Sequence, residues 1–344
     1  MTTALPAPPA SPGSGALTAS GKQPRQLDPG HERSDRYFFA GARAIGLSVL
    51  VVTGAIAVFL GYQGIPTLHH YGLHFLTTTQ WDPEIDKIGI AAVLVGTIEV
   101  ALVAMAVAFP LAVMFALFIT DYAPRRLKSW LISAIDLMAA VPSIIYGLWG
   151  FFLLQPHAIN LSRWLSQHFG WFPLFHVDTD PNAAVWQQSR YTSSAFIAGL
   201  AVSMMAIPLA CAVIRAVFDQ APAGEREAAM ALGATRWGVA RKVVLPFGKG
   251  GIIGGSMLAL GRALGETAAV LIIISPAYEI KPRILEAGTQ TTSALIAGNF
   301  GSATKAQLTA LLAAGFVLFL MTLAVNTVAA TIIARSRSGA GTDI

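Results

Sequence analysis

Long apolar segments with few charges dominate this chain of 344 residues and decide what it can fold into. They lie at about 38–62, 88–120, 129–154, 193–217, 247–275 and 307–333. A helix needs roughly 20 apolar residues to cross the hydrocarbon core of a bilayer, and each segment is long enough. Apolar residues make up 54% of the chain and charged residues 12%, too few to cover a water-soluble surface. The sequence therefore predicts an all-α integral membrane protein with six transmembrane helices.

The Lys and Arg residues indicate the orientation, because loops rich in them stay in the cytoplasm. The segment 88–120 is long enough for two spans, but two spans would move the loop with Arg125, Arg126 and Lys128 outside. One tilted helix, bent at Pro110, keeps that loop and the basic N-terminal tail on the same side. Both termini are then cytoplasmic, and the loops at about 63–87, 155–192 and 276–306 lie outside. The net charge of +5 reflects cytoplasmic loops rather than a nucleic-acid partner.

The cytoplasmic loop after the fourth segment carries a helix–turn–helix pattern. Pro222 suits the start of a helix, and the alanine-rich run after it is a strong helix former. Gly233 suits a left-handed helix stop, and Thr235 can cap a second short helix that begins near Arg236. We therefore expect two short helices joined at Gly233, with Pro246 at the entry to the next span.

This loop resembles the Glu-Ala-Ala signature of the permease subunits of ATP-driven, binding-protein-dependent importers. The matching positions, at the family's spacing, are Glu227, Ala228, Ala229, Gly233, Val243, Leu245 and Pro246. In that family the short helix docks on a separate ATPase subunit. The resemblance therefore implies that Glu227, Ala228, Ala229, Gly233, Leu245 and Pro246 couple this chain to an ATPase.

A basic and an acidic residue interrupt the fifth apolar segment. Arg262 and Glu266 lie one helical turn apart if the helix is continuous. An Arg at the centre of a membrane helix costs about 2.5–3.5 kcal/mol on insertion scales, so it needs a partner or a role. Two readings stay open: an ion pair that fixes helix packing, and a guanidinium offered to a passing oxyanion with Glu266 orienting or releasing it.

Three stretches sharpen the resemblance: residues 80–100 and 140–150, and the run LGRALGETAAV at 260–270. Together they look like the permease subunit of the phosphate ABC importer. Trp81-Asp82-Pro83 and Gly96-Thr97 favour its PstC type over the sister PstA type. The resemblance covers residues 40–335 and implies a type I ABC importer (MetI-like) permease fold with one extra N-terminal span.

The resemblance also implies partners and a division of the chain. The partners are a sister permease subunit of PstA type, an ATPase dimer of PstB type, an external phosphate-binding protein of PstS type, and membrane lipid. ATP and Mg would be bound by the ATPase, so this chain needs no cofactor and is not an enzyme. The expected parts are a disordered cytoplasmic tail (1–36), the first span with an outer loop (37–87), a permease core (88–335) with the coupling loop 218–246, and a C-terminal cytoplasmic tail (336–344). The predicted location is the plasma (inner) membrane.

Several polar and small residues stay ambiguous. Pro142 and Ser143 either kink the third span or break it and expose backbone groups to substrate, which makes Ser143 a candidate pathway residue. The pairs Gly250/Gly254, Gly251/Gly255 and Gly261/Gly265 fit close helix packing, within one subunit or between two. We interpret Glu99, Asp136 and the lone Cys211 as structural. We also expect no metal at His69, His70 and His74, because no carboxylate or cysteine follows at ligand spacing.

Two rival functions remain. One is import of another oxyanion, such as sulfate, molybdate or a phosphonate, by the same machinery. The other is an ion-coupled secondary transporter that uses Arg262, Glu266 and Glu99 without nucleotide. No nucleophile–base pair stands out in the spans, so a membrane enzyme is disfavoured.

Overall fold

The computed structural model describes residues 33–177 and 190–336. The tails predicted at 1–36 and 336–344 lie almost entirely outside this range. The chain divides into two units, residues 1–53 and 54–344. Helix α1 (Arg33–Tyr71) begins in the first unit, where its side chains from Arg36 onward are exposed, and extends into the second.

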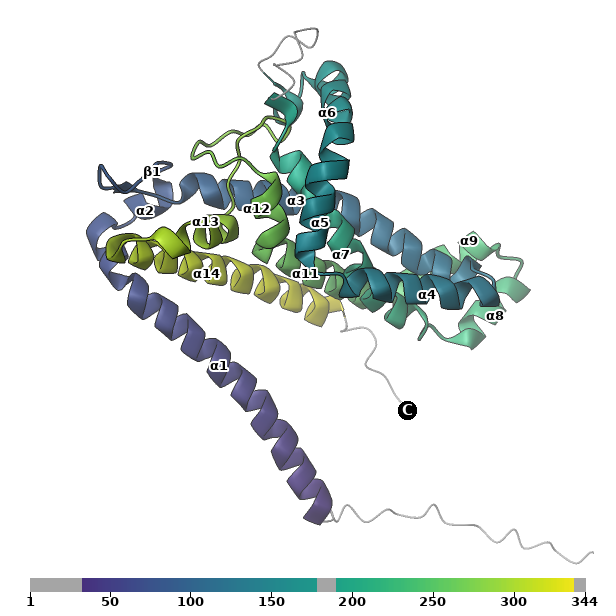
Figure 1. Ribbon diagram of the computed structural model, residues 1–344. Helices are drawn as coiled ribbons and strands as arrows, with labels where there is room; N and C mark the ends of the chain where they lie inside the picture. The colour runs from purple at the N-terminus through teal and green to yellow at the C-terminus, as the bar shows by residue number, and fades with distance from the viewer. Residues whose placement is uncertain (1–32, 178–189, 337–344) are drawn as a thin grey trace, which may run out of the picture. The chain divides into compact units, whose positions relative to one another are not determined.

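Helices make up most of the second unit (Figure 1). A short hairpin of β1 (Trp81–Asp82) and β2 (Lys87–Ile88), with Trp81 opposite Ile88, is the exception to the all-α prediction. The longer helical elements are α3 (Ala91–Leu117), α4 (Arg125–Ala140), α5 (Ser143–Trp149), α6 (Gln155–Phe169), α7 (Ala195–Phe218), α8 (Ala223–Ala231), α11 (Lys249–Gly265), α12 (Ala268–Ile273), α13 (Thr292–Asn299) and α14 (Lys305–Ser336). Short helical pieces connect them: α2 (His74–Thr77), η1 (Phe118–Tyr122), η2 (Gly150–Leu154), η3 (Pro173–Phe175), α9 (Arg236–Val239), η5 (Ala240–Val244), α10 (Leu245–Phe247) and η6 (Phe300–Ser302).

Four helical segments of the described chain are long and apolar enough to cross a membrane unbroken: 36–71, 91–122, 195–218 and 305–332. Two further pairs qualify as bent segments, so the number reaches six if each bent pair is one span. The segment predicted at 88–120 is one of the unbroken four, with Pro110 inside α3. The prediction of one helical segment rather than two is confirmed.

The third predicted span, 129–154, is not one straight helix. It breaks after α4, and the helical segment that starts at Ser143 leaves at 93° (Figure 1). Val141 is extended (ψ 130°) because the following Pro142 disfavours helical backbone at that position and lacks an N–H. Of the two alternatives at Pro142, a break rather than a kink is correct.

Two predicted outer loops contain helices that the sequence did not predict. The loop expected at 155–192 begins with α6, which continues α5 through η2. The loop expected at 276–306 contains α13, whose first residues are buried. There the Thr292 backbone N–H donates to the Thr97 hydroxyl of α3 over 3.0 Å. Polar residues in α6 and α13 are typical of loops in the sequence. Packing against other helices makes these segments helical.

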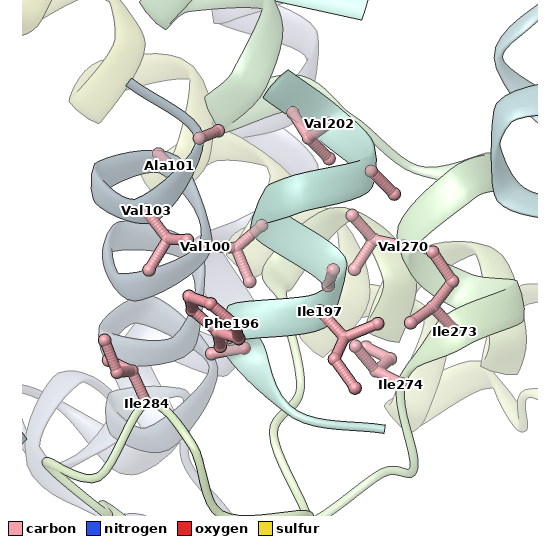
Figure 2. Close-up of a cluster of buried hydrophobic side chains, with 14 of the residues drawn as sticks. Val100, Ala101, Val103, Phe196, Ile197, Val202, Val270, Ile273, Ile274 and Ile284 are labelled. Atoms are coloured by element: carbon pink, nitrogen blue, oxygen red, sulfur yellow. The ribbon is translucent and has the colours of Figure 1, made fainter. Parts of the chain in front are cut away.

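The core of this unit forms where α7 packs against α3 and α12 (Figure 2). Small residues let the helices approach closely. An added Cβ at Gly199 would lie 2.6 Å from the Val103 side chain, and one at Gly251 would lie 2.5 Å from Val217. Gly251 and Gly255 therefore pack on α7 within this chain, whereas an added Cβ at Gly250 would meet nothing within 4 Å. For the pair Gly251/Gly255, packing inside one subunit is confirmed.

We expect Gly147→Ala to destabilise the protein. A Cβ there would lie 2.7 Å from the Ala269 Cα of α12, and backbone cannot yield as a flexible side chain can. Overpacking of this kind costs about 1–3 kcal/mol. The measurement is the temperature at which the detergent-purified chain loses its monodisperse peak in size-exclusion chromatography. Gly250→Ala is the matched control and should not lower that temperature, since its Cβ enters open space and favours the helix. Equal temperatures for the two variants would contradict the packing described here.

Candidate functional site

The fifth apolar segment is interrupted where the site residues lie. Helix α11 ends at Gly265, and Glu266 is extended (ψ 128°) before α12 begins at Ala268. The predicted continuous helix over 247–275 is therefore wrong. The polar side chains that follow offer the backbone other hydrogen bonds, which favours a break at this point.

The break replaces lost helical hydrogen bonds with side-chain contacts. The Glu266 carboxylate accepts from the Ala269 N–H over 3.3 Å at the start of α12. The Ser293 hydroxyl donates to the Glu266 carbonyl over 2.6 Å. A carboxylate is favoured at the N-terminal end of a helix, where backbone N–H groups are unpaired. Glu266 is 7% exposed and holds the joint between α11, α12 and α13.

Arg262 does not form the ion pair that a continuous helix would allow. Over residues 33–177 and 190–336, no ion pair includes Arg262 or Glu266. The Arg262 side chain is exposed on the surface of this chain, while Glu266 is buried in the joint. The alternative of an Arg262–Glu266 pair that fixes packing is therefore wrong.

Arg262 instead lines a cavity of about 760 Å³ between α11 and α14. Polar groups reach this cavity from both helices: Glu266 from the end of α11, Thr322 and Asn326 from α14. Most other lining residues are apolar or glycine: Leu60, Leu209, Met257, Leu258, Gly261, Gly265, Gly315, Leu318 and Phe319. An apolar wall with a few convergent polar groups is the usual character of a small-ligand site.

The third predicted pathway residue is placed elsewhere. Ser143 is the first residue of α5, directly after the break at Pro142, and is half-buried. It does not line the cavity that holds Arg262. Neither Glu99 on α3 nor Asp136 on α4 lines it either. The structure thus brings together Arg262 and Glu266, but not Ser143.

The predicted coupling segment folds as expected. Helix α8 begins after Pro222, and Gly233 adopts the left-handed conformation (φ 83°) that ends it. The Thr235 hydroxyl accepts from the Gly238 N–H over 3.1 Å and caps α9. Two short helices joined at Gly233 are therefore confirmed. The arm of α9, η5 and α10 then bends by 70° at Gly248 into α11.

The outer side of this segment is exposed and partly apolar. Glu227 and Ala228 of α8 face solvent, and Leu232 beyond its end is 89% exposed. Met230 and Trp237 are also exposed, at 51% and 56%. Exposed apolar side chains gathered on one segment mark a contact surface rather than a core.

One inward contact of α8 could not be read from the sequence. The Arg226 guanidinium donates to the Asp121 carboxylate at the end of α3 over 2.5 Å, and to the Phe218 carbonyl at the end of α7 over 2.5 Å. Asp121 and Arg226 are 105 residues apart, so no local spacing signals the pair.

Near the C-terminal end of α1 lies a carboxylate that the sequence did not indicate as a partner of the histidines. Asp86 lies 3.0 Å from His70 and accepts from the Tyr71 hydroxyl over 2.5 Å. The Tyr71 hydrogen bond, followed by that of His70, lowers the pKa of Asp86 below its usual value. In the described part of the chain, no three His, Cys, Asp or Glu side chains are grouped to hold a metal ion.

Comparisons with known proteins agree with this architecture. Residues 108–338 match the family model described as binding-protein-dependent transport system inner membrane component. The chain is 38% identical over 304 residues to a Xylella fastidiosa protein named phosphate transport system permease protein PstC, covering 88% of this chain and 91% of that protein. It is 38% identical to PstC 2 of Mycobacterium tuberculosis, over 87% of this chain and 92% of the relative.

Solved structures share the fold at low identity. One is a chain of a bacterial alginate ABC transporter in complex with an alginate pentasaccharide-bound periplasmic protein, with a TM-score of 0.56 and 15% identity. That match covers 89% of this chain and 96% of the other. The chain therefore shares its fold with a chain of that ABC transporter, in agreement with the predicted fold. The chain belongs to the family of inner membrane components of binding-protein-dependent transport systems.

Proposed function

We propose that this chain is the transmembrane permease subunit of an ATP-driven importer that moves inorganic phosphate into the cytoplasm by alternating access. The observation that carries the proposal is Arg262, a cation within an apolar helix that lines a cavity and has no acidic partner among the described residues. Relatives named phosphate transport system permease proteins support phosphate as the cargo.

Arg262 suits transient binding of an oxyanion. Its planar guanidinium presents a fork of donors that matches two oxygens of a phosphate ion. Because the residue is exposed on this chain, a bound anion stays partly solvated and can leave again. In this proposal Glu266 stabilises the helix break that ends α11 next to Arg262. Ser143 follows a second helix break and lines another part of the pathway.

The energy for transport comes from a partner in this proposal. The residues Glu227, Ala228, Ala229, Gly233, Leu245 and Pro246 form or flank the two short helices that would dock on an ATPase dimer, which binds ATP and Mg. Closure of the dimer would move α8 and α9, and the cavity would turn outward. A sister permease chain would cover the open side of the cavity, and an external phosphate-binding protein would deliver the anion. Both termini lie in the cytoplasm in this arrangement.

Replacing Arg262 with Gln should stop phosphate uptake and leave complex assembly intact. The substitution removes a charge-assisted hydrogen-bond donor worth about 1.5–3 kcal/mol, which corresponds to roughly a ten- to hundredfold loss of rate. The measurement is uptake of labelled phosphate by cells or proteoliposomes that contain the whole importer. Arg262→Lys keeps the charge without the fork and should retain intermediate uptake.

Full phosphate uptake by the Arg262→Gln variant would contradict the role of the arginine. Uptake of sulfate, molybdate or a phosphonate in place of phosphate by the parent protein would instead identify another oxyanion as the cargo. Uptake by ATP-free vesicles under an ion gradient would identify a secondary transporter.

Replacing Ala228 with Arg should release the ATPase. Ala228 faces solvent on α8, so a large charged side chain leaves the permease fold intact but fills the space needed for close docking. The measurement is the amount of ATPase that co-purifies with the tagged permease. Ala306→Arg, at an exposed alanine in the first turn of α14, is the matched control. Equal co-purification with both variants would remove α8 from the proposed interface.

A further inference from the structure

The side of α8 that faces the rest of the protein is attached to the ends of two long helices by one side chain. Arg226, on the second turn of α8, contacts the Asp121 carboxylate through Nη1 and the Phe218 carbonyl through Nη2. Asp121 belongs to η1, which extends α3, and Phe218 is the last residue of α7. A cation at the carbonyl end of α7 also has the favourable sign for the helix dipole.

The contact is shielded from solvent. The Arg226 and Asp121 side chains are 20% and 12% exposed. Their remaining polar atoms, Arg226 Nε and Asp121 Oδ2, are buried and have no hydrogen-bond partner in the described protein. A shielded ion pair is strongly disrupted when one partner is lost, because the other charge stays buried without compensation.

A second ion pair in the same region is different. Lys128 at the start of α4 lies 2.9 Å from Asp219, next to the end of α7, and these side chains are 32% and 37% exposed. An exposed pair contributes little, and neither partner belongs to α8. Among the ion pairs of the described residues, Arg226–Asp121 is the one that joins α8 to the extension of α3.

The contacts of α8 with the rest of the chain are few. None of its residues is fully buried: Arg226 and Ala229 are half-buried, and the others are exposed. A helix without a packed face moves independently of the spans unless polar contacts fix it. Among the described residues, the side-chain hydrogen bonds that join α8 to α7 and to the extension of α3 come from Arg226.

We infer that Arg226 is a positioning residue that makes the inner ends of α3 and α7 move with α8, so that closure of the partner ATPase is converted into movement of the spans. The inference rests on the proposed function. The unpaired Nε and Oδ2 atoms allow the pair to change from one hydrogen bond to a two-bonded fork as α8 rotates, so the attachment persists through the motion.

The test compares transport with ATP hydrolysis in the reconstituted importer, supplied with inorganic phosphate and its binding protein. Arg226→Gln should still co-purify with the ATPase, because its side chain points away from the exposed side of α8. It should hydrolyse ATP but move roughly tenfold less phosphate per ATP, as expected for the loss of a coupling free energy of ordinary size. The double variant that exchanges the two residues, Asp121→Arg with Arg226→Asp, should recover part of the lost ratio of phosphate moved to ATP hydrolysed.

Lys128→Gln serves as the control and should keep the parent ratio, since it removes a positive charge from the same region without detaching α8. An unchanged ratio in Arg226→Gln would overturn the inference, and so would an equal fall in hydrolysis and transport. If the parent complex itself imports no phosphate, the proposed function fails instead. The two failures are therefore distinguishable.

Discussion

The need to satisfy backbone groups away from water controls how this chain can interrupt its helices. A membrane helix can break only where side chains or neighbouring helices replace the lost hydrogen bonds. At the end of α11, the Glu266 carboxylate accepts from Ala269 and the Ser293 hydroxyl donates to the Glu266 carbonyl. The residues at this break, Gly265 and Glu266, also line the cavity beside Arg262. Residues 290–293, which look like an ordinary polar loop, are buried for the same reason.

The end of the molecule that carries α8 has a different task in the proposed importer, which is the transfer of force. Helix α8 has an exposed side with apolar residues and an inner side fixed by Arg226. The bend of 70° at Gly248 connects the same segment to α11, which carries Arg262. Movement of one short segment can therefore reach α3 and α7 through Arg226, and the cavity through α11. Discrete contacts of this kind are what rigid-body switching requires.

The features predicted from the sequence are those that depend on local chemistry. The apolar segments, the helix stop at Gly233 and the cap at Thr235 each follow from neighbouring residues. The features that were missed depend on distant residues. Helix α13 is buried against α3, and Asp121 meets Arg226 across 105 residues. The Arg262–Glu266 ion pair, one of the two readings left open, required a continuous helix, whereas α11 ends at Gly265 between the two residues. The roles of Arg262, Glu266 and Ser143 in transport remain predictions.

The open flank of the Arg262 cavity has a consequence for biogenesis. In the proposed assembly, a copy of this chain without its sister subunit would leave the Arg262 guanidinium uncovered, and water or lipid headgroups would be drawn in to solvate it. Drawing in water or headgroups thins the bilayer locally, and this thinning would disappear once the sister chain covers the open side of the cavity. If the proposed sister chain covers this flank, unequal synthesis of the two chains would leave orphan copies in a deformed patch of membrane, which would favour matched production of both.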